Sequence, residues 1–231
     1  MEKLVLIGGG GHAKVVLDMA EDCAELEVVG YFDRDAGTSA QLPAPFLGDV
    51  SHLARLAAQG IRKVFIAIGD NLLRSQLAEM VVGQGFELVN IVSRHAMVSR
   101  RAELCTGIAV MPGAIINAYA RIGEGCVINT GATVDHDCKI GAWAHLGPQT
   151  GLAGGVEVGE GTYMGVGVRV IPRISIGAWT TVGAGAVVVR NLPERVLAVG
   201  VPARILRRLE PQVGRVASGI GCASEAGISP N

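Results

Sequence analysis

The sequence has no excess of charge of either sign and no long hydrophobic run. Twenty lysines and arginines stand against 21 aspartates and glutamates, which leaves a net charge of −1 at pH 7. Affinity for nucleic acid through the phosphate backbone is therefore not expected. The chain contains no stretch of about 18 uninterrupted apolar residues, so we expect no membrane span. Met1 leads directly into a short apolar segment without a basic leader, so we expect no signal peptide and a cytoplasmic protein.

The cysteines also lack a pattern. Cys23, Cys105, Cys126, Cys138 and Cys222 do not have the spacing of metal ligands, so we expect no metal. Small buried core residues are the simpler interpretation of Cys126 and Cys138. This use of cysteine fits a reducing compartment.

What the sequence does have is a period of six residues. Every sixth residue over a long stretch is aliphatic: Val92, Val98, Leu104, Val110, Ile116, Ile122, Ile128, Val134, Ile140, Leu146, Leu152, Val158, Met164, Val170, Ile176 and Val182. The next residue is often glycine, and the fifth position of each hexad is small or branched. This pattern predicts a parallel β-helix, in which short strands stack coil on coil and aliphatic side chains fill the interior. An α-helix would need a period of about 3.6 and far fewer glycines.

The first 90 or so residues have a different organisation. Strands are expected at 3–7, 28–32, 63–68 and 86–91, and helices at 14–22, 50–59 and 72–82. Alternating strands and helices predict a small parallel sheet. The segment is too short for two mononucleotide-binding halves, so a mononucleotide, such as the handle of an activated sugar, fits better than a dinucleotide.

Three polar clusters follow the strands of this α/β domain. Residues 8–13 fit a G-x-G-x-x-A loop between a strand and a helix, where backbone N–H groups can approach a phosphate. Asp33 ends the second strand, 20 residues after Ala13, where an acidic group can bind a ribose or a base. Because ligands bind beyond the carboxyl ends of parallel strands, we expect residues 8–12, 33–34 and 69–71 to line one crevice.

Residues 1 to about 209 resemble the bacterial sugar acetyltransferases that join a small nucleotide-binding α/β domain to a left-handed β-helix of hexapeptide repeats. The resemblance is carried by GGGGH at 8–12, FIAIGDN at 65–71, NTGATVDHD at 129–137 and GVPAR at 200–204. It implies a nucleotide-sugar-binding α/β domain at 1–91 and a left-handed parallel β-helix at 92–190. A C-terminal loop, a short helix and a disordered tail are expected at 191–231.

The resemblance also implies the site. Acetyl transfer to an amine or hydroxyl needs a base with a pKa near neutral, as histidine has. The family's base falls on His136, whose neighbour Asp137 can orient the ring and raise its basicity. The expected acetyl-CoA contacts are His145, Gly154, Val166 and Ala184. The expected sugar-nucleotide contacts are Gly10, Gly11, His12, Asp33, Arg34 and Gly69.

One of these expectations has support from the coil period, and two further details concern coenzyme A and the nucleobase. Gly154 lies one coil beyond His136, where its N–H would face the thioester oxygen. Arg204, Arg207 and Arg208 are candidates for the coenzyme A phosphates. Some relatives carry two acids at the positions of Asp33 and Arg34, so the nucleobase stays open.

Assembly is predicted from the outer wall of the repeats. Hexad positions there carry few charges, as at Asn117, Ala118, Asn129, Thr130 and Ala132, and an uncharged flat wall is typical of an interface. The resemblance implies a homotrimer with coenzyme A between adjacent β-helices.

We therefore expect an acetyl-CoA-dependent N-acetyltransferase acting on a UDP- or GDP-linked 4-amino-4,6-dideoxy sugar, with direct attack and no metal. O-acetylation of a sugar such as sialic acid is an alternative. A non-catalytic nucleotide-binding scaffold is another. A β-helix hydratase would need three zinc histidines, and His95, His136 and His145 lack a matching spacing.

Overall fold

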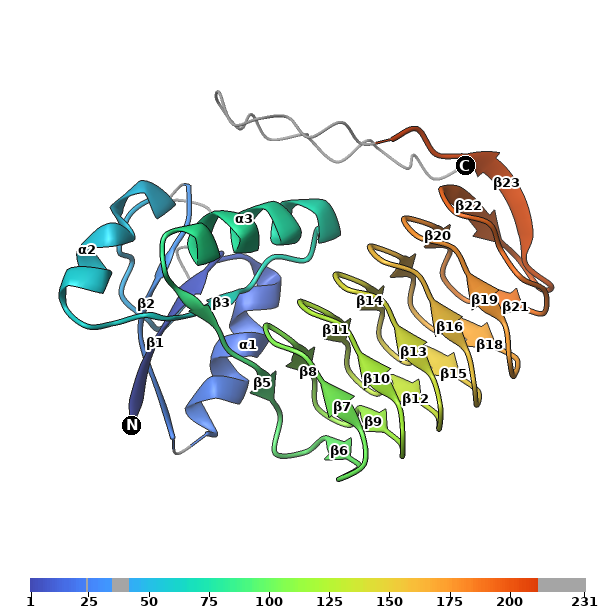
Figure 1. Cartoon of the computed structure of the whole chain (residues 1–231), viewed down its shortest axis with the longest axis horizontal. Helices are drawn as coiled ribbons and strands as arrows, with labels where there is room; N and C mark the ends of the chain where they lie inside the picture. The colour runs from blue at the N-terminus through green and yellow to red at the C-terminus, as the bar shows by residue number, and fades with distance from the viewer. Residues whose placement is uncertain (24, 35–41, 212–231) are drawn as a thin grey trace.

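An N-terminal α/β domain lies against one side of a long parallel β-helix in the computed structural model (Figure 1). The structure describes residues 1–23, 25–34 and 42–211. Most of the tail predicted to be disordered, 212–231, lies outside these residues. Within them, no helix is long and apolar enough to cross a membrane. The predicted fold class, a small parallel α/β domain followed by a β-helix of hexapeptide repeats, is confirmed.

The α/β domain is built on one parallel sheet with the strand order β2-β1-β3-β4. Its elements are β1 (Glu2–Ile7), α1 (Gly11–Glu21), β2 (Leu26–Phe32), the 3₁₀ turn η1 (Val50–His52), α2 (Ala54–Ala58), β3 (Lys63–Ile66), α3 (Asn71–Gly83) and β4 (Glu87–Leu88). The helix expected at 50–59 is thus split into η1 and the short α2. The chain adds β2 on one side of β1 and then β3 and β4 on the other side, so the strand order reverses at β1. Sheets of this kind bind ligands beyond the carboxyl ends of the strands at such a point.

The segment expected as a fourth strand, 86–91, belongs to two sheets. Leu88 pairs with β3, whereas Ile91 already pairs with Ala109 of the β-helix. Asn90 makes the transition, because its side chain donates to Cys105 O (2.8 Å) and accepts from Ile108 N (2.9 Å). The chain therefore passes into the first coil without a linker.

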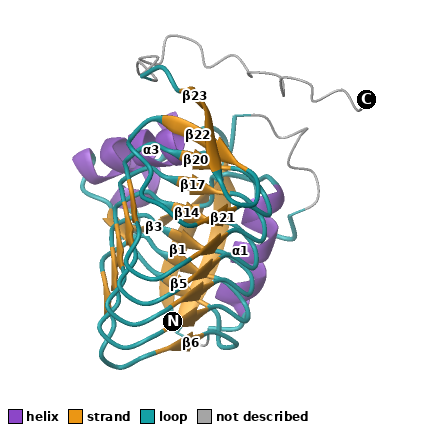
Figure 2. Cartoon of the chain, turned by 90° about the vertical axis from the view of Figure 1, so that its right-hand side faces the viewer, coloured by secondary structure: helices purple, strands orange, loops and turns teal. Residues whose placement is uncertain are grey.

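The β-helix is a prism with three flat faces, seen along its length in Figure 2. Paired residues in neighbouring coils are 18 apart, as in Val127 with His145. We name the faces by their strands. The covered face has β5 (Ile91–Val92), β8 (Ala109–Val110), β11 (Val127–Ile128), β14 (His145–Leu146), β17 (Tyr163–Met164) and β20 (Thr181–Val182). The uncharged face has β6 (Met97–Val98), β9 (Ile115–Ile116), β12 (Thr133–Val134), β15 (Gly151–Leu152), β18 (Arg169–Val170) and β21 (Val187–Val188). The charged face has β7 (Glu103–Leu104), β10 (Arg121–Ile122), β13 (Lys139–Ile140), β16 (Glu157–Val158) and β19 (Ser175–Ile176).

The aliphatic residue of each hexad is the second residue of a strand and points into the interior. From Val110 onward these side chains are at most 4% exposed, whereas Val92, in the open first coil, is 39% exposed. Cys126 and Cys138 are fully buried at fifth positions, as expected for small core residues. Ala132, expected on the outer wall, is also fully buried, because it too is a fifth position and faces the interior.

The three faces differ in what covers them. The α/β domain packs on the covered face, where Ala13 and Leu17 of α1 share a core with Ala109 and Val127. The outward residues of the charged face form ion pairs between coils, such as Lys139 with Glu157 (2.7 Å). On the uncharged face, Arg169 is the one charged residue among the first residues of the six strands.

The C-terminus closes one end of the prism. β22 (Val196–Val199) extends the covered face, and β23 (Arg204–Arg208) returns antiparallel to it. A short helix was expected somewhere in 191–231, and the described part of this segment, residues 191–211, contains no helix. A strand forms because the last coil leaves the edge of β22 unpaired, and a returning strand satisfies its backbone groups.

Candidate active site

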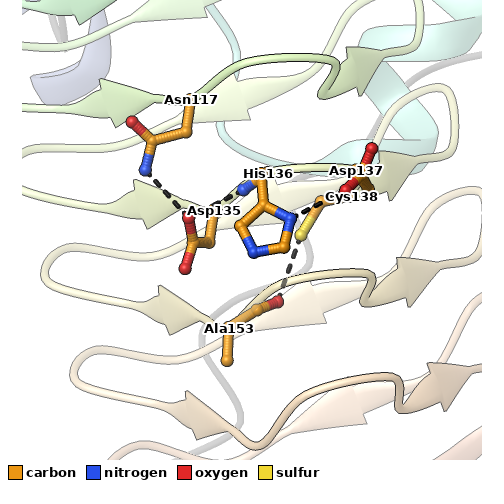
Figure 3. Close-up of polar contacts among 6 residues, drawn as sticks. All are labelled: Asn117, Asp135, His136, Asp137, Cys138 and Ala153. Carbon is orange, nitrogen blue, oxygen red and sulfur yellow. Dashed lines mark hydrogen bonds and ion pairs between the residues drawn. The ribbon is translucent and has the colours of Figure 1, made fainter.

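His136 lies at the corner between β12 and β13, where the uncharged face meets the charged face (Figure 3). Its side chain is 62% exposed, and Nδ1 lies 2.7 Å from Asp137 Oδ2. Asp137 adopts a left-handed backbone conformation, φ 60°, which aspartate tolerates at a tight corner. A carboxylate can only accept, so Nδ1 carries the proton and the lone pair is on Nε2. The arrangement leaves a base facing outward.

A second carboxylate supports this histidine from the backbone side. Asp135 Oδ1 accepts from the His136 N–H (2.8 Å) and from Asn117 Nδ2 (3.0 Å), one coil below. The hydrogen bond with Asp137, and then the charge of Asp135, raise the pKa of His136 above its ordinary value. The hydrogen bond from the His136 amide lowers the pKa of Asp135, so this carboxylate stays ionised.

Gly154 lies directly against the His136 ring. A Cβ added at Gly154 would be 2.6 Å from both Cε1 and Nε2 of His136, too close for any side chain to share the space. The next coil is held in place by Gly155 N, which donates to His136 O (2.9 Å). The open side of the base is therefore bordered by glycine backbone.

Val166 and Ala184 lie on the other edge of the uncharged face. They occupy equivalent places in successive coils, since Gly185 N donates to Val166 O, and both are exposed. The loop at 200–204 joins the same edge, because Val187 N donates to Gly200 O and Ala203 N to Val187 O. Arg204, Arg207 and Arg208 are exposed on β23. The uncharged face therefore separates this edge from the corner of His136.

His145 lies elsewhere, beneath the α/β domain. It is 8% exposed, with Nδ1 3.3 Å from Gly69 O and Nε2 3.0 Å from Asn129 Nδ2. The carbonyl requires a protonated Nδ1 and the amide an unprotonated Nε2, which defines a neutral tautomer. Burial and the charge of Arg74 lower the pKa of His145 to about 4. Within one chain, His145 is thus remote from the corner of His136.

The glycine loop of the α/β domain is fastened to the end of β2. Asp33 Oδ2 accepts from Gly9 N (2.7 Å), and Asp33 Oδ1 accepts from Arg34 N. Gly10 caps α1, and a Cβ at Gly10 or Gly11 would meet no atom within 4 Å. The backbone at the start of α1 is therefore open to a ligand.

His12 follows this loop and points toward the junction of the two domains. Its ring centroid lies 6.3 Å from that of His145. Burial, followed by the charge of Arg74, lowers the pKa of His12 to about 4. Its Nε2 is buried and has no hydrogen-bond partner among the described residues. This nitrogen is therefore an unpaired polar atom enclosed at the junction of the two domains.

The three clusters expected to line one crevice border two cavities. A cavity of about 90 Å³ is lined by Gly8, Asp33 and Arg34, together with residues of η1 and α3. Residues 69–71 instead line a cavity of about 620 Å³ beside Tyr163 and Trp179. The residues after β3 therefore line a cavity with side chains of the β-helix, separate from the cavity beside the glycine loop.

Sequence reasoning missed Arg74, a buried charged residue of α3, and placed Asn71 in the crevice without predicting its burial beside Arg74. Arg74 is 1% exposed and hydrogen-bonds to both domains. A single arginine in an amphipathic helix gives no signal of this, because most such arginines face solvent. Among residues 1–23, 25–34 and 42–211, no three His, Cys, Asp or Glu side chains are grouped so as to hold a metal ion.

Comparison with known proteins agrees with both halves of the chain. The model of the PglD N-terminal domain matches residues 3–81, and that of the bacterial transferase hexapeptide (six repeats) matches 119–154. PerB from Caulobacter crescentus, solved with CoA and GDP-perosamine, is 51% identical, with a TM-score of 0.85 over 89% of this chain and 97% of that chain. The acetyltransferase domain of PglB from Neisseria gonorrhoeae, solved with acetyl coenzyme A, is 32% identical, with a TM-score of 0.84 over 89% of this chain and 99% of that chain.

A third similar structure is of a variant of the Caulobacter enzyme. It is a histidine-to-alanine variant of the GDP-perosamine N-acetyl transferase, again in complex with CoA and GDP-perosamine. It is 48% identical, with a TM-score of 0.81 over 89% of this chain and 97% of that chain.

Proposed function

The chain belongs to the bacterial sugar N-acetyltransferases whose N-terminal domain is of the PglD type, and from this premise we propose that it acetylates the amine of a nucleotide-linked amino sugar with acetyl-CoA. The observation that carries the proposal is the outward base His136, with Asp137 on Nδ1 and Gly154 against the ring. Such a base is what an amine needs when it attacks a thioester.

The chemistry follows from this geometry. The amine nitrogen attacks the thioester carbonyl carbon, and His136 Nε2 accepts the proton that the amine loses. Asp137 stabilises the imidazolium that forms, as it holds Nδ1–H. The tetrahedral oxygen would lie over the backbone of Gly154, where an N–H can stabilise the charge. Collapse expels the coenzyme A thiolate, which takes the proton from His136 Nε2, so that the neutral base is regenerated and no covalent enzyme intermediate forms.

We assign the nucleotide to the α/β domain. Gly10 and Gly11 expose backbone at the start of α1, where a phosphate is favoured, and His12 adds a neutral nitrogen donor or acceptor. Asp33 and Arg34 lie at the end of β2, where the ribose or the base would lie, and the sugar would lie in the cavity that Gly69 lines. Since the Caulobacter enzyme was solved with GDP-perosamine, a GDP-linked 4-amino sugar is the first candidate.

We assign acetyl-CoA to a groove between subunits of a trimer. The uncharged face, bordered by His136 and Gly154 on one edge and by Val166 and Ala184 on the other, is suited to pack against another chain. Cyclic symmetry would give three equivalent grooves, each with His136 from one chain and the covered face of the next. His145 would meet acetyl-CoA only in such a groove.

The test is transfer with a panel of substrates. Release of coenzyme A thiol and the mass of the product should show N-acetylation of a GDP-linked 4-amino sugar in preference to UDP- and dTDP-linked sugars. His136→Ala should lower kcat by about 10²-fold or more, the usual contribution of a general base. Acetylation of hydroxyl sugars alone, or a His136→Ala variant with normal kcat, would refute the proposal.

A further inference from the structure

Arg74 connects the two domains through all of its N–H groups. Nη1 donates to Ile68 O (3.0 Å) and Gly69 O (3.2 Å), at the end of β3. Nε donates to Gly125 O (2.8 Å), and Nη2 donates to Trp143 O (2.9 Å) and Asn71 Oδ1 (2.9 Å). A guanidinium has five N–H donors, so none is left unused. Burial lowers the pKa of Arg74 to about 10, so it is a cation at neutral pH.

Asn71 continues the contact along the β-helix. It is 8% exposed, and its Nδ2 donates to Gly161 O (3.0 Å). Gly125, Trp143 and Gly161 are 18 residues apart and occupy the same corner of three successive coils. Arg74 and Asn71 together therefore contact backbone carbonyls at this corner in three successive coils.

This matters because a β-helix is a repeating surface. Neighbouring coils are about 4.8 Å apart and present equivalent backbone groups, so a domain could dock one coil higher or lower and meet similar hydrogen-bond partners. A second feature distinguishes the coils at this corner, where glycine alternates with tryptophan. A Cβ at Gly125 would collide with the Trp143 ring, and one at Gly161 with the Trp179 ring, so each indole lies across the glycine before it. The one-coil repeat is thereby broken where α3 docks.

The coil that Arg74 selects is the coil of the proposed base. His136 lies at one corner of that coil, between β12 and β13, and Trp143 follows at the next corner, after β13. The same guanidinium that holds Trp143 O holds the carbonyl of Gly69, to which His145 Nδ1 also points. In a cyclic trimer, equivalent coils lie at equal heights along the axis. The height of the α/β domain is then fixed relative to a neighbour's base as well.

We propose that Arg74, with Asn71, is a positioning residue that sets the coil on which the α/β domain docks, and so the height of the amino sugar relative to His136. This inference rests on the proposed function. Misplacement of a reacting group by about 1 Å can cost about 10²-fold in rate, so loss of the contact should act on kcat.

Three variants test the inference. Arg74→Met removes the contacts, and Arg74→Lys keeps the charge but offers one nitrogen that cannot reach the β3 carbonyls and both corners. Arg62→Met is the matched control, since Arg62 is in the same domain and makes one exposed hydrogen bond, to Gly85 O (3.2 Å). Both Arg74 variants should lower kcat by about tenfold or more. The KM for acetyl-CoA and the Kd for GDP should stay within about threefold of wild type, because the assigned acetyl-CoA contacts all lie on β-helices and the GDP contacts lie within the α/β domain.

Calorimetry gives a readout that does not depend on activity. In Arg74→Met the α/β domain should melt apart from the β-helix and at a lower temperature, whereas wild type and Arg62→Met should melt in one transition. If Arg74→Met does not fold, Asn71→Ala, which removes the Gly161 contact, should lower kcat in the same direction by a smaller factor.

The inference is overturned if Arg74→Lys keeps the kcat of wild type, since charge alone would then suffice. It is also overturned if GDP affinity falls in parallel with kcat, which would indicate a local role in the nucleotide site. If wild type transfers no acetyl group, the proposed function fails. The docking role of Arg74 is tested separately by calorimetry, and single-step melting of Arg74→Met at the wild-type temperature would overturn it.

Discussion

At the scale of single residues, the chemistry is concentrated in His136 and the groups that touch it. Asp137 holds Nδ1, Asp135 holds the backbone amide, and Gly154 leaves room for Nε2. Each of the three makes a different and separable contribution, which variants can distinguish.

Asp137→Asn should shift the acid limb of the kcat/KM profile to lower pH. The base must be neutral to accept a proton, so activity is lost as pH falls through the pKa of His136. The hydrogen bond with Asp137 is the largest cause that raises this pKa, and an amide lacks the charge. The pH dependence of kcat/KM for the sugar nucleotide measures the shift. An unchanged limb would mean that another group titrates.

Gly154→Ala should lower kcat while the fold survives. The added methyl carbon would meet Cε1 and Nε2 of His136 at 2.6 Å, and the exposed ring can swing away. The loss should approach that of removing the base, about 10²-fold. Gly83→Ala is a suitable control, because a Cβ there meets nothing within 4 Å. Steady-state kinetics and thermal melting of both variants would decide the matter, and a fully active Gly154→Ala would contradict the assigned geometry.

At the scale of elements, β1 and β2 form the nucleotide site through their carboxyl ends. Asp33 has two tasks there, because it accepts from Gly9 N and also lies where a ligand would bind. Replacing Asp33 would therefore alter both the shape of the glycine loop and the affinity for the sugar nucleotide.

Asp33→Ala should raise the KM for the sugar nucleotide by about tenfold or more, and should leave the KM for acetyl-CoA unchanged. A lost hydrogen bond to a charged group costs about 1.5–3 kcal/mol, which corresponds to this range. Asp33→Asn keeps an oxygen for Gly9 N and should have a smaller effect. Substrate titrations of the two variants separate loop support from ligand contact. Equal effects on both substrates would contradict the division of labour between the domains.

At the scale of the whole molecule, the three faces of the prism differ in what covers them and in their charge. One is covered by the α/β domain, one carries ion pairs, and one is left uncharged beside His136. We expect the last to be the trimer interface, because exposed uncharged walls of this extent usually mark interaction sites.

Mixing two impaired variants tests shared sites. His136→Ala lacks the base, and Asp33→Ala, assayed below its KM for sugar nucleotide, should keep about a tenth of the wild-type activity or less. Random trimers from equal amounts should regain about a quarter of the wild-type sites, because each site then combines one chain with its neighbour. Light scattering at the assay concentration gives the mass. An active monomer would contradict the trimer, and mixed trimers without activity would place each site within one chain.

The sequence by itself determined the features that depend on local pattern. The period of six dictated which side chains enter the β-helix, from Val110 to Val182, because each coil repeats the same backbone turn. The βα alternation and the glycine loop likewise predicted the parallel sheet and the open start of α1, since both depend on residues near in sequence.

Only the tertiary structure decided what depends on contacts between distant segments. The strand at Arg204–Arg208 was not predicted, because the unpaired edge of β22 is invisible in the sequence. The buried place of His145, 76 residues from Gly69, and the docking of Arg74 on Gly125, 51 residues away, arise from how one domain settles on the other. A periodic pattern specifies the coil, but it repeats, and so it cannot say on which coil a domain docks.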